Sequence, residues 1–213
     1  MVRSKICGVT TEADLQAVAD AGADAVGILT EVSVDTPREV APERAADLVA
    51  AAPPFLSTVL VAMPETASRA VELAGAVTPD AIQLHGDFDE TDIRYIRREA
   101  RADVITAVDA DDPDQARRYD DVADAILLDS TTESGAGGTG ETHDWQAARD
   151  LVADLSSPVV LAGGLTPANV ADAVRTVDPY AVDVSSGVEQ TGGEKDHDAV
   201  RSFLRNADVE VPA

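Results

Sequence analysis

The sequence contains a single cysteine, Cys7, and it lies two residues after Lys5 in the segment KICGVT. If this segment is a β-strand, Lys5 and Cys7 project from one face and Ile6 from the other. A free thiol has a pKa of about 8.5 and acts as a base only when ionised, a state that a nearby ammonium favours. The spacing therefore places one of the two lysines of the chain on the same face as the thiol, where its charge would lower the pKa of Cys7. The structural alternative is a small, buried, apolar side chain.

Polar side chains also close three later apolar segments. Gln83 and His85 alternate with aliphatic residues in AIQLHG, Asp129 ends AILLD, and Asp183 and Ser185 alternate with valines in AVDVSS. We expect these side chains to face one rim while their aliphatic neighbours face the other way. The alternatives are a solvated polar rim and, for His85, a hydrogen-bonded structural histidine.

Glycines concentrate in the second half of the chain, in GAGGTG (135–140), AGGLTP (162–167) and SSGVEQTGG (185–193). Small residues let backbone N–H groups approach an anion closely. These loops follow the last three predicted strands, and the last two such loops form the usual phosphate site of a barrel. We therefore predict phosphate binding there, with ordinary tight turns as the alternative.

The elements that must position these residues alternate along the chain. Apolar, β-branched runs predict eight strands, and segments with helical apolar spacing separate them. The repeat of roughly 20 to 30 residues is that of a βα unit, which predicts one α/β domain over residues 1–213, a (β/α)₈ TIM barrel. An open doubly wound sheet is the alternative. The strands are predicted at 2–7, 23–29, 55–62, 81–85, 103–108, 125–129, 158–162 and 181–185.

Helix boundaries are predicted from caps and breakers. Thr11 can cap a first helix that Gly22 ends. Thr166 can cap a helix with Pro167 at its first position. The last helix should bury Val200, Phe203 and Leu204.

The chain is strongly acidic, with 40 acidic and 16 basic side chains and a net charge of −24. Such a charge repels nucleic acids and anionic membranes, so we expect neither as a partner. An acidic chain with only two lysines is typical of a salt-rich cytosol, which predicts a halophilic source. One cysteine and three dispersed histidines predict neither an intramolecular disulfide nor a metal site. No signal-like segment or run of ~18 apolar residues is present, so we expect a cytoplasmic protein.

Several of these motifs together resemble the phosphoribosylanthranilate isomerase family of tryptophan biosynthesis. The matching blocks are KICGVT, ADAVGI, AIQLHG, ILLDS with GGTG, LAGGLTPANV, AVDVSSGVE and KDHD, in order along nearly the whole chain. The resemblance implies a (β/α)₈ barrel and an aldose–ketose isomerase. It further implies an Amadori rearrangement of N-(5-phosphoribosyl)anthranilate to 1-(2-carboxyphenylamino)-1-deoxyribulose 5-phosphate without metal or cofactor.

The resemblance also implies roles for single residues. Cys7 would be the general base and Asp129 the general acid, which must carry a proton and so needs a raised pKa. Arg38 would bind the anthranilate carboxylate, Asp183 the sugar hydroxyls or the anilino nitrogen, and His85 would line the mouth. Gln83 and Lys5 complete the predicted substrate-binding set. The residues that would bind the phosphate are Gly163, Gly164, Ser185, Ser186 and Gly187. His143 and His197 lie at helix starts without a role.

One departure from the family concerns the segment after the second strand, where aromatic residues are usual. Here it reads VGILTEVSVDTPRE, so we expect Ile28 and Leu29 to form an aliphatic wall for the ring.

Two other functions stay open. A different phosphosugar barrel enzyme would rely on a lysine inside the barrel, for which Lys5 is the candidate, because Lys195 lies beyond the last strand. A non-catalytic barrel would bind a phospholigand and need neither Cys7 nor Asp129. Both a monomer and a homodimer suit this fold.

Overall fold

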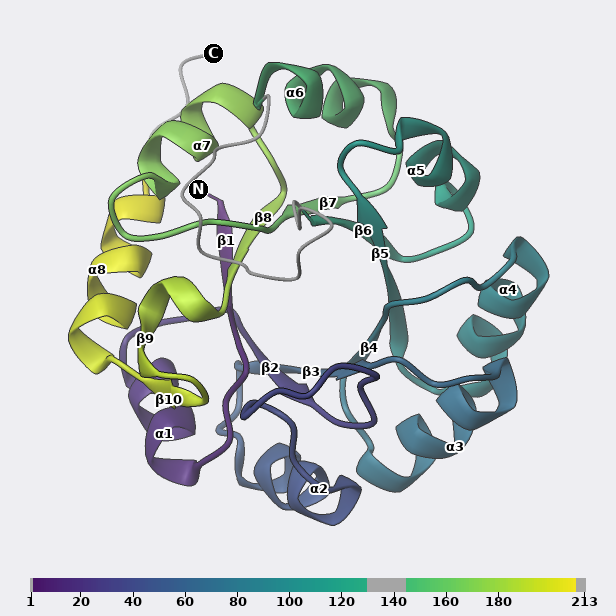
Figure 1. Cartoon of the computed structure of the whole chain (residues 1–213), viewed down its shortest axis with the longest axis horizontal. Coiled ribbons are helices and arrows are strands. Elements are labelled where there is room, and N and C mark those ends of the chain that lie inside the picture. The colour runs from purple at the N-terminus through teal and green to yellow at the C-terminus, as the bar shows by residue number, and fades with distance from the viewer. Residues whose placement is uncertain (1, 130–144, 210–213) are drawn as a thin grey trace.

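The computed structural model describes residues 2–129 and 145–209. Eight parallel strands form a closed barrel in the order β1 to β8, each paired with its neighbours in sequence and β8 with β1. Helices surround the barrel as an outer ring (Figure 1). This arrangement confirms the predicted (β/α)₈ fold.

The strands and helices alternate as the apolar periodicity predicts. The strands are β1 Arg3–Cys7, β2 Ala25–Leu29, β3 Ser57–Ala62, β4 Ala81–Leu84, β5 Asp103–Asp109, β6 Ala125–Asp129, β7 Val159–Leu161 and β8 Ala181–Val184. The helices are α1 Glu12–Asp20, α2 Pro42–Ala51, α3 Ala67–Val77, α4 Glu90–Glu99, α5 Pro113–Tyr119, α6 Trp145–Asp154, α7 Val170–Val177 and α8 His197–Ala207. A short 3₁₀ turn, Ser186–Val188, and a small hairpin of β9 Glu189–Thr191 and β10 Glu194–Lys195 follow β8.

Most predicted boundaries are confirmed to within two residues. The Thr11 side chain caps α1 by accepting a hydrogen bond from the Asp14 amide, and Gly22 follows its end with φ of 89°. The prediction for Thr166 is wrong in position, because α7 begins only at Val170, with Asn169 as its N-cap. Thr166 instead accepts the Ala168 amide within a separate turn.

Two apolar layers follow from the alternation along the strands. Ile6, Ile82 and Ile126 are completely buried between the barrel and the helices. Their neighbours on the other face fill the barrel interior in two small clusters. The interior residues are Cys7, Val59, Val61 and Ala81 in one cluster and Leu127, Val160, Ala162 and Ala181 in the other.

None of the described helices is both long and apolar enough to cross a membrane. Within residues 2–129 and 145–209, no group of three or more histidine, cysteine or acidic side chains has the arrangement of a metal site.

Candidate active site

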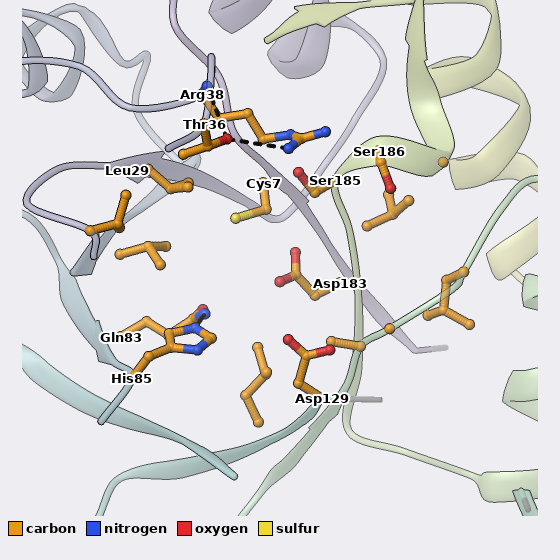
Figure 2. A pocket seen from close by; sticks show the side chains of 18 of the residues that line it. Cys7, Leu29, Thr36, Arg38, Gln83, His85, Asp129, Asp183, Ser185 and Ser186 are labelled. Carbon is orange, nitrogen blue, oxygen red and sulfur yellow. Dashed lines mark hydrogen bonds between the residues drawn. The ribbon is translucent and has the colours of Figure 1, made fainter. Parts of the chain in front are cut away.

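A pocket of about 310 Å³ opens at the carboxyl ends of the strands. Figure 2 shows its side chains converging from several strands and from the segment after β2. All the predicted site residues except Lys5 line it. The lining set comprises Cys7, Arg38, Gln83, His85, Asp129, Gly163, Gly164, Asp183, Ser185, Ser186 and Gly187. The prediction that polar residues of four strands share one rim is confirmed for all of them except Lys5. The confirmed residues are Cys7, Gln83, His85, Asp129, Asp183 and Ser185.

Cys7 ends β1 with its thiol in the pocket (Figure 2), and a glycine of the neighbouring strand makes room for it. Cys7 pairs with Gly27 in the register of β1 and β2. A Cβ at Gly27 would lie 2.7 Å from the Cys7 sulfur and 3.1 Å from the Lys5 Nζ. A larger residue would displace the thiol or the ammonium, so the glycine at position 27 leaves the space that these two groups need.

Lys5 lies inside the barrel below the pocket lining and forms a buried ion pair. Its Nζ donates a hydrogen bond of 2.7 Å to Oδ2 of Asp183, which projects from β8 beside β1. The other carboxylate oxygen of Asp183, Oδ1, is buried without a hydrogen-bond partner among the described residues. Because a buried, unpaired oxygen is costly, Oδ1 is a ready acceptor for a ligand in the pocket.

The pKa of Cys7 is raised in this site. Burial is the largest influence, and the Lys5 ammonium opposes it while the Asp183 carboxylate adds to it. Burial also disfavours the charged form of Lys5, but Asp183 and Cys7 reverse that effect and raise the Lys5 pKa. Lys5 therefore acts on Cys7 in the predicted direction, but its effect is outweighed, so the thiol keeps its proton at neutral pH.

Asp129 ends β6 and is half-buried at the pocket. Strand β6 pairs with β5 and β7, whereas β1 pairs with β2 and β8, so Asp129 and Cys7 come from non-adjacent strands. Figure 2 shows both side chains pointing into the pocket, with the Asp183 carboxylate between them in this view. The raised pKa expected for Asp129 stays a prediction.

His85 and Gln83 form the wall from β4 and the residue after it. The Gln83 Nε2 lies 2.9 Å from the His85 Nε2. Burial, with a smaller contribution from the Lys5 charge, lowers the pKa of His85 to about 4. His85 is therefore neutral at physiological pH, and its uncharged imidazole can form a hydrogen bond with a ligand.

Arg38 is held at the mouth by side chains from two directions. Its Nε and Nη2 donate to the two carboxylate oxygens of Glu189 at 3.0 and 2.7 Å, and its Nη1 donates to Thr36 Oγ1 at 3.3 Å. A guanidinium has five N–H groups. The described residues thus use three of them and leave two for a ligand.

The glycines after β7 and β8 form the concave end of the pocket. Gly163 and Gly164 have φ of 84° and 61°, a conformation that side chains disfavour. A Cβ at Gly187 would collide with the carbonyl oxygen of Leu165, so these two loops meet at that position. The third predicted glycine segment, 135–140, and His143 lie outside the described residues.

An aliphatic wall is confirmed, but one of its two predicted residues is wrong. Leu29 lines the pocket together with Val32, Val34 and Met63. Ile28 points outward and is completely buried in the layer under the helices. Strand alternation makes adjacent residues face opposite sides, so Ile28 and Leu29 could not both contribute.

Glu189 and Lys195 were not predicted as site residues, but they contact the site through Arg38. Both follow β8 and are buried in the hairpin of β9 and β10, where Lys195 Nζ lies 2.7 Å from Glu189 Oε1. The scarcity of lysine was a usable signal, because both lysines of the chain form buried ion pairs next to residues that line the pocket. His197 begins α8 and contacts Asp14, away from the pocket lining.

The sequence pattern is shared with proteins of a known family. A family model described as N-(5'phosphoribosyl)anthranilate (PRA) isomerase matches residues 4–206. The N-(5'-phosphoribosyl)anthranilate isomerase of Halorubrum lacusprofundi is 61% identical over 211 residues and covers 99% of each chain. This relative agrees with the halophilic source predicted from composition.

Solved structures agree in fold. The phosphoribosyl anthranilate isomerase of Thermotoga maritima is 39% identical, has a TM-score of 0.86, and covers 97% of this chain and 98% of that chain. Another solved isomerase, in complex with reduced 1-(o-carboxyphenylamino)-1-deoxyribulose 5-phosphate, is 36% identical with a TM-score of 0.83 and the same coverage. The chain belongs to the N-(5'-phosphoribosyl)anthranilate isomerase family.

Proposed function

We propose that this enzyme converts N-(5-phosphoribosyl)anthranilate to 1-(2-carboxyphenylamino)-1-deoxyribulose 5-phosphate, with Asp129 as general acid and Cys7 as general base. The observation that carries these roles is that one pocket holds a thiol and a carboxyl group from non-adjacent strands. The same pocket offers a guanidinium and a glycine–serine cradle. Those two features suit the carboxylate and the phosphate of this substrate.

Asp129 starts the reaction by donating its proton to the furanose ring oxygen. The bond between that oxygen and C1′ breaks, and the nitrogen lone pair forms an iminium with C1′. The acid must be protonated for this step, which a desolvated position favours. The half-buried place of Asp129 at the end of β6 supports this role.

Cys7 completes the rearrangement by accepting the proton from C2′. The electrons of the C2′–H bond form the C1′–C2′ double bond of an enolamine, which tautomerises to the ketone. Burial raises the pKa of this thiol. A cationic iminium beside it favours the thiolate and also acidifies the C2′ proton. The base is therefore activated by the intermediate it must deprotonate, with Lys5 as a constant supporting charge.

The remaining residues bind the substrate. The two unused N–H groups of Arg38 suit a carboxylate, and Asp183 Oδ1 can accept from a sugar hydroxyl or the anilino N–H. Neutral His85 and Gln83 face the sugar, and Gly163, Gly164, Ser185, Ser186 and Gly187 bind the phosphate. Lys5 lies below the lining, so it acts on the substrate through Asp183 and Cys7.

We also propose that the enzyme works in the cytoplasm, because a phosphorylated sugar substrate is charged and stays inside the cell. A monomer and a homodimer remain the two predicted assemblies.

Wild-type turnover tests this proposal. Phosphoribosylanthranilate is generated in high KCl, and its fluorescence decay and the ketone product are followed after enzyme addition. Rapid decay with formation of the ketose is the expected result. Tight binding without turnover would support the non-catalytic barrel instead. Turnover of a different phosphosugar, with none of this substrate, would support another barrel enzyme.

A further inference from the structure

A buried carboxylate lies directly behind the guanidinium of Arg38. The side chain of Glu189 is only 4% exposed, whereas that of Arg38 is 25% exposed to the pocket mouth. The two groups form a two-point contact, Nε to Oε1 and Nη2 to Oε2. Such a contact fixes the plane of a guanidinium as well as its position.

Lys195 keeps Glu189 ionised and in place. Its completely buried Nζ donates to Glu189 Oε1 at 2.7 Å and to the carbonyl oxygen of Ser185 at 3.3 Å. Burial alone would raise the pKa of Glu189, but Arg38 and Lys195 hold it below its usual range. Burial lowers the pKa of Lys195, and its contact with Glu189 opposes that effect. In the cluster of Arg38, Glu189 and Lys195, two basic side chains share one carboxylate, so Glu189 does not neutralise both of them. Glu189 can thus orient Arg38 without cancelling its attraction for an anion.

The hairpin of β9 and β10, which holds Glu189 and Lys195, packs on the segment after β2, which holds Arg38. Gly192 and Gly193, between β9 and β10, pack on Pro37, the residue before Arg38. A Cβ at Gly193 would lie 2.5 Å from the Pro37 carbonyl oxygen. Thr10 Oγ1 also donates to the Gly193 carbonyl at 2.9 Å. The hairpin is therefore fitted against the segment after β2.

We propose that Glu189, held by Lys195, is a positioning residue that orients Arg38 to bind the carboxylate of the substrate. The inference rests on the proposed function, because it needs a substrate with a carboxylate at Arg38. It predicts that loss of Glu189 weakens recognition of that carboxylate in particular, rather than catalysis in general.

The test compares two substrates that differ only in the carboxylate. Phosphoribosylanthranilate and the analogue made from aniline and ribose 5-phosphate are assayed with wild type, Glu189→Gln, Arg38→Met and the combined variant. We expect Glu189→Gln to raise KM for the carboxylated substrate by about 10- to 100-fold with little change in kcat. We expect little change in KM for the aniline analogue and little further loss when Glu189→Gln is added to Arg38→Met.

Two further variants separate positioning from stability. Glu194→Gln removes an exposed charge from the same hairpin and should leave both KM values unchanged. Glu189→Gln with Lys195→Met removes both buried partners, so no unpaired lysine remains. If this double variant folds and recovers the wild-type KM, the defect of Glu189→Gln came from the unpaired charge and the inference is wrong.

Three further outcomes would contradict the inference. If Glu189→Gln raises KM equally for both substrates, Glu189 does not act through the carboxylate site. If wild type isomerises both substrates equally well, Arg38 does not recognise the carboxylate and the inference falls while the isomerase activity stands. Wild type that converts neither substrate would overturn the proposed function itself.

Discussion

The neutral state of His85 predicts how stability depends on pH. Burial in the β4 wall lowers its pKa to about 4 in the folded chain, against about 6.5 for an unperturbed histidine. Between these values the unfolded chain binds a proton that the folded chain excludes. The stability that neutral His85 contributes is therefore complete above pH ~6.5 and is lost as the pH falls towards 4.

The magnitude follows from these two pKa values. At pH 5, about 1.5 below the unfolded pKa, the cost at ~1.36 kcal/mol per pH unit is about 2 kcal/mol. His85 faces an open pocket, so solvent screening reduces this to about 1 to 2 kcal/mol. High salt does not remove the effect, because its main cause is burial rather than attraction between exposed charges.

The assay is denaturant unfolding of wild type and His85→Gln in high KCl at pH 7.5 and pH 5. Glutamine keeps a polar group next to Gln83 but cannot take up a proton. Other titrating groups affect both proteins alike, so they cancel in the difference. We expect wild type to lose about 1 to 2 kcal/mol more than His85→Gln between the two pH values. Equal losses in the two proteins would refute the reasoning.

Two other predictions concern Cys7. Asp183→Asn should lower the thiol pKa, because the carboxylate now raises it, and Lys5→Met should raise it further. Alkylation by iodoacetamide against pH measures both shifts, and a titration unchanged by Lys5→Met would remove Lys5 as a supporting charge. Gly27→Ala should displace the Cys7 sulfur, which lies 2.7 Å from the added methyl position. We expect a stability loss of about 1 to 3 kcal/mol and a reduced kcat, measured by unfolding and turnover. An unchanged kcat would show that the thiol position is not critical.

The fold was largely predictable because its signals are local and repeated. Apolar alternation located all eight strands, and the same alternation sent Cys7, Gln83 and Asp183 to one rim. Errors arose where the same local sequence fits two structures, such as a helix cap and a turn. Thr166 is a suitable helix cap, but its side chain serves a turn that precedes α7.

The residues that line the candidate site were predictable, but the buried residues that contact them from behind were not. Cys7 and Asp129 carry recognisable chemistry at strand ends. Glu189 contacts Arg38 from 151 residues away, and no local pattern indicates that contact. The protonation state of Cys7 was also out of reach, because it depends on how burial and Asp183 compare with Lys5 in the folded barrel.

The central claim is that Cys7 and Asp129 are the base and the acid of one reaction. The most direct test is the turnover of phosphoribosylanthranilate in high KCl by wild type, Cys7→Ser and Asp129→Asn, each shown to be folded. The account predicts that each variant loses about two to four orders of magnitude in kcat. A folded variant of either residue that retains near wild-type kcat would contradict it.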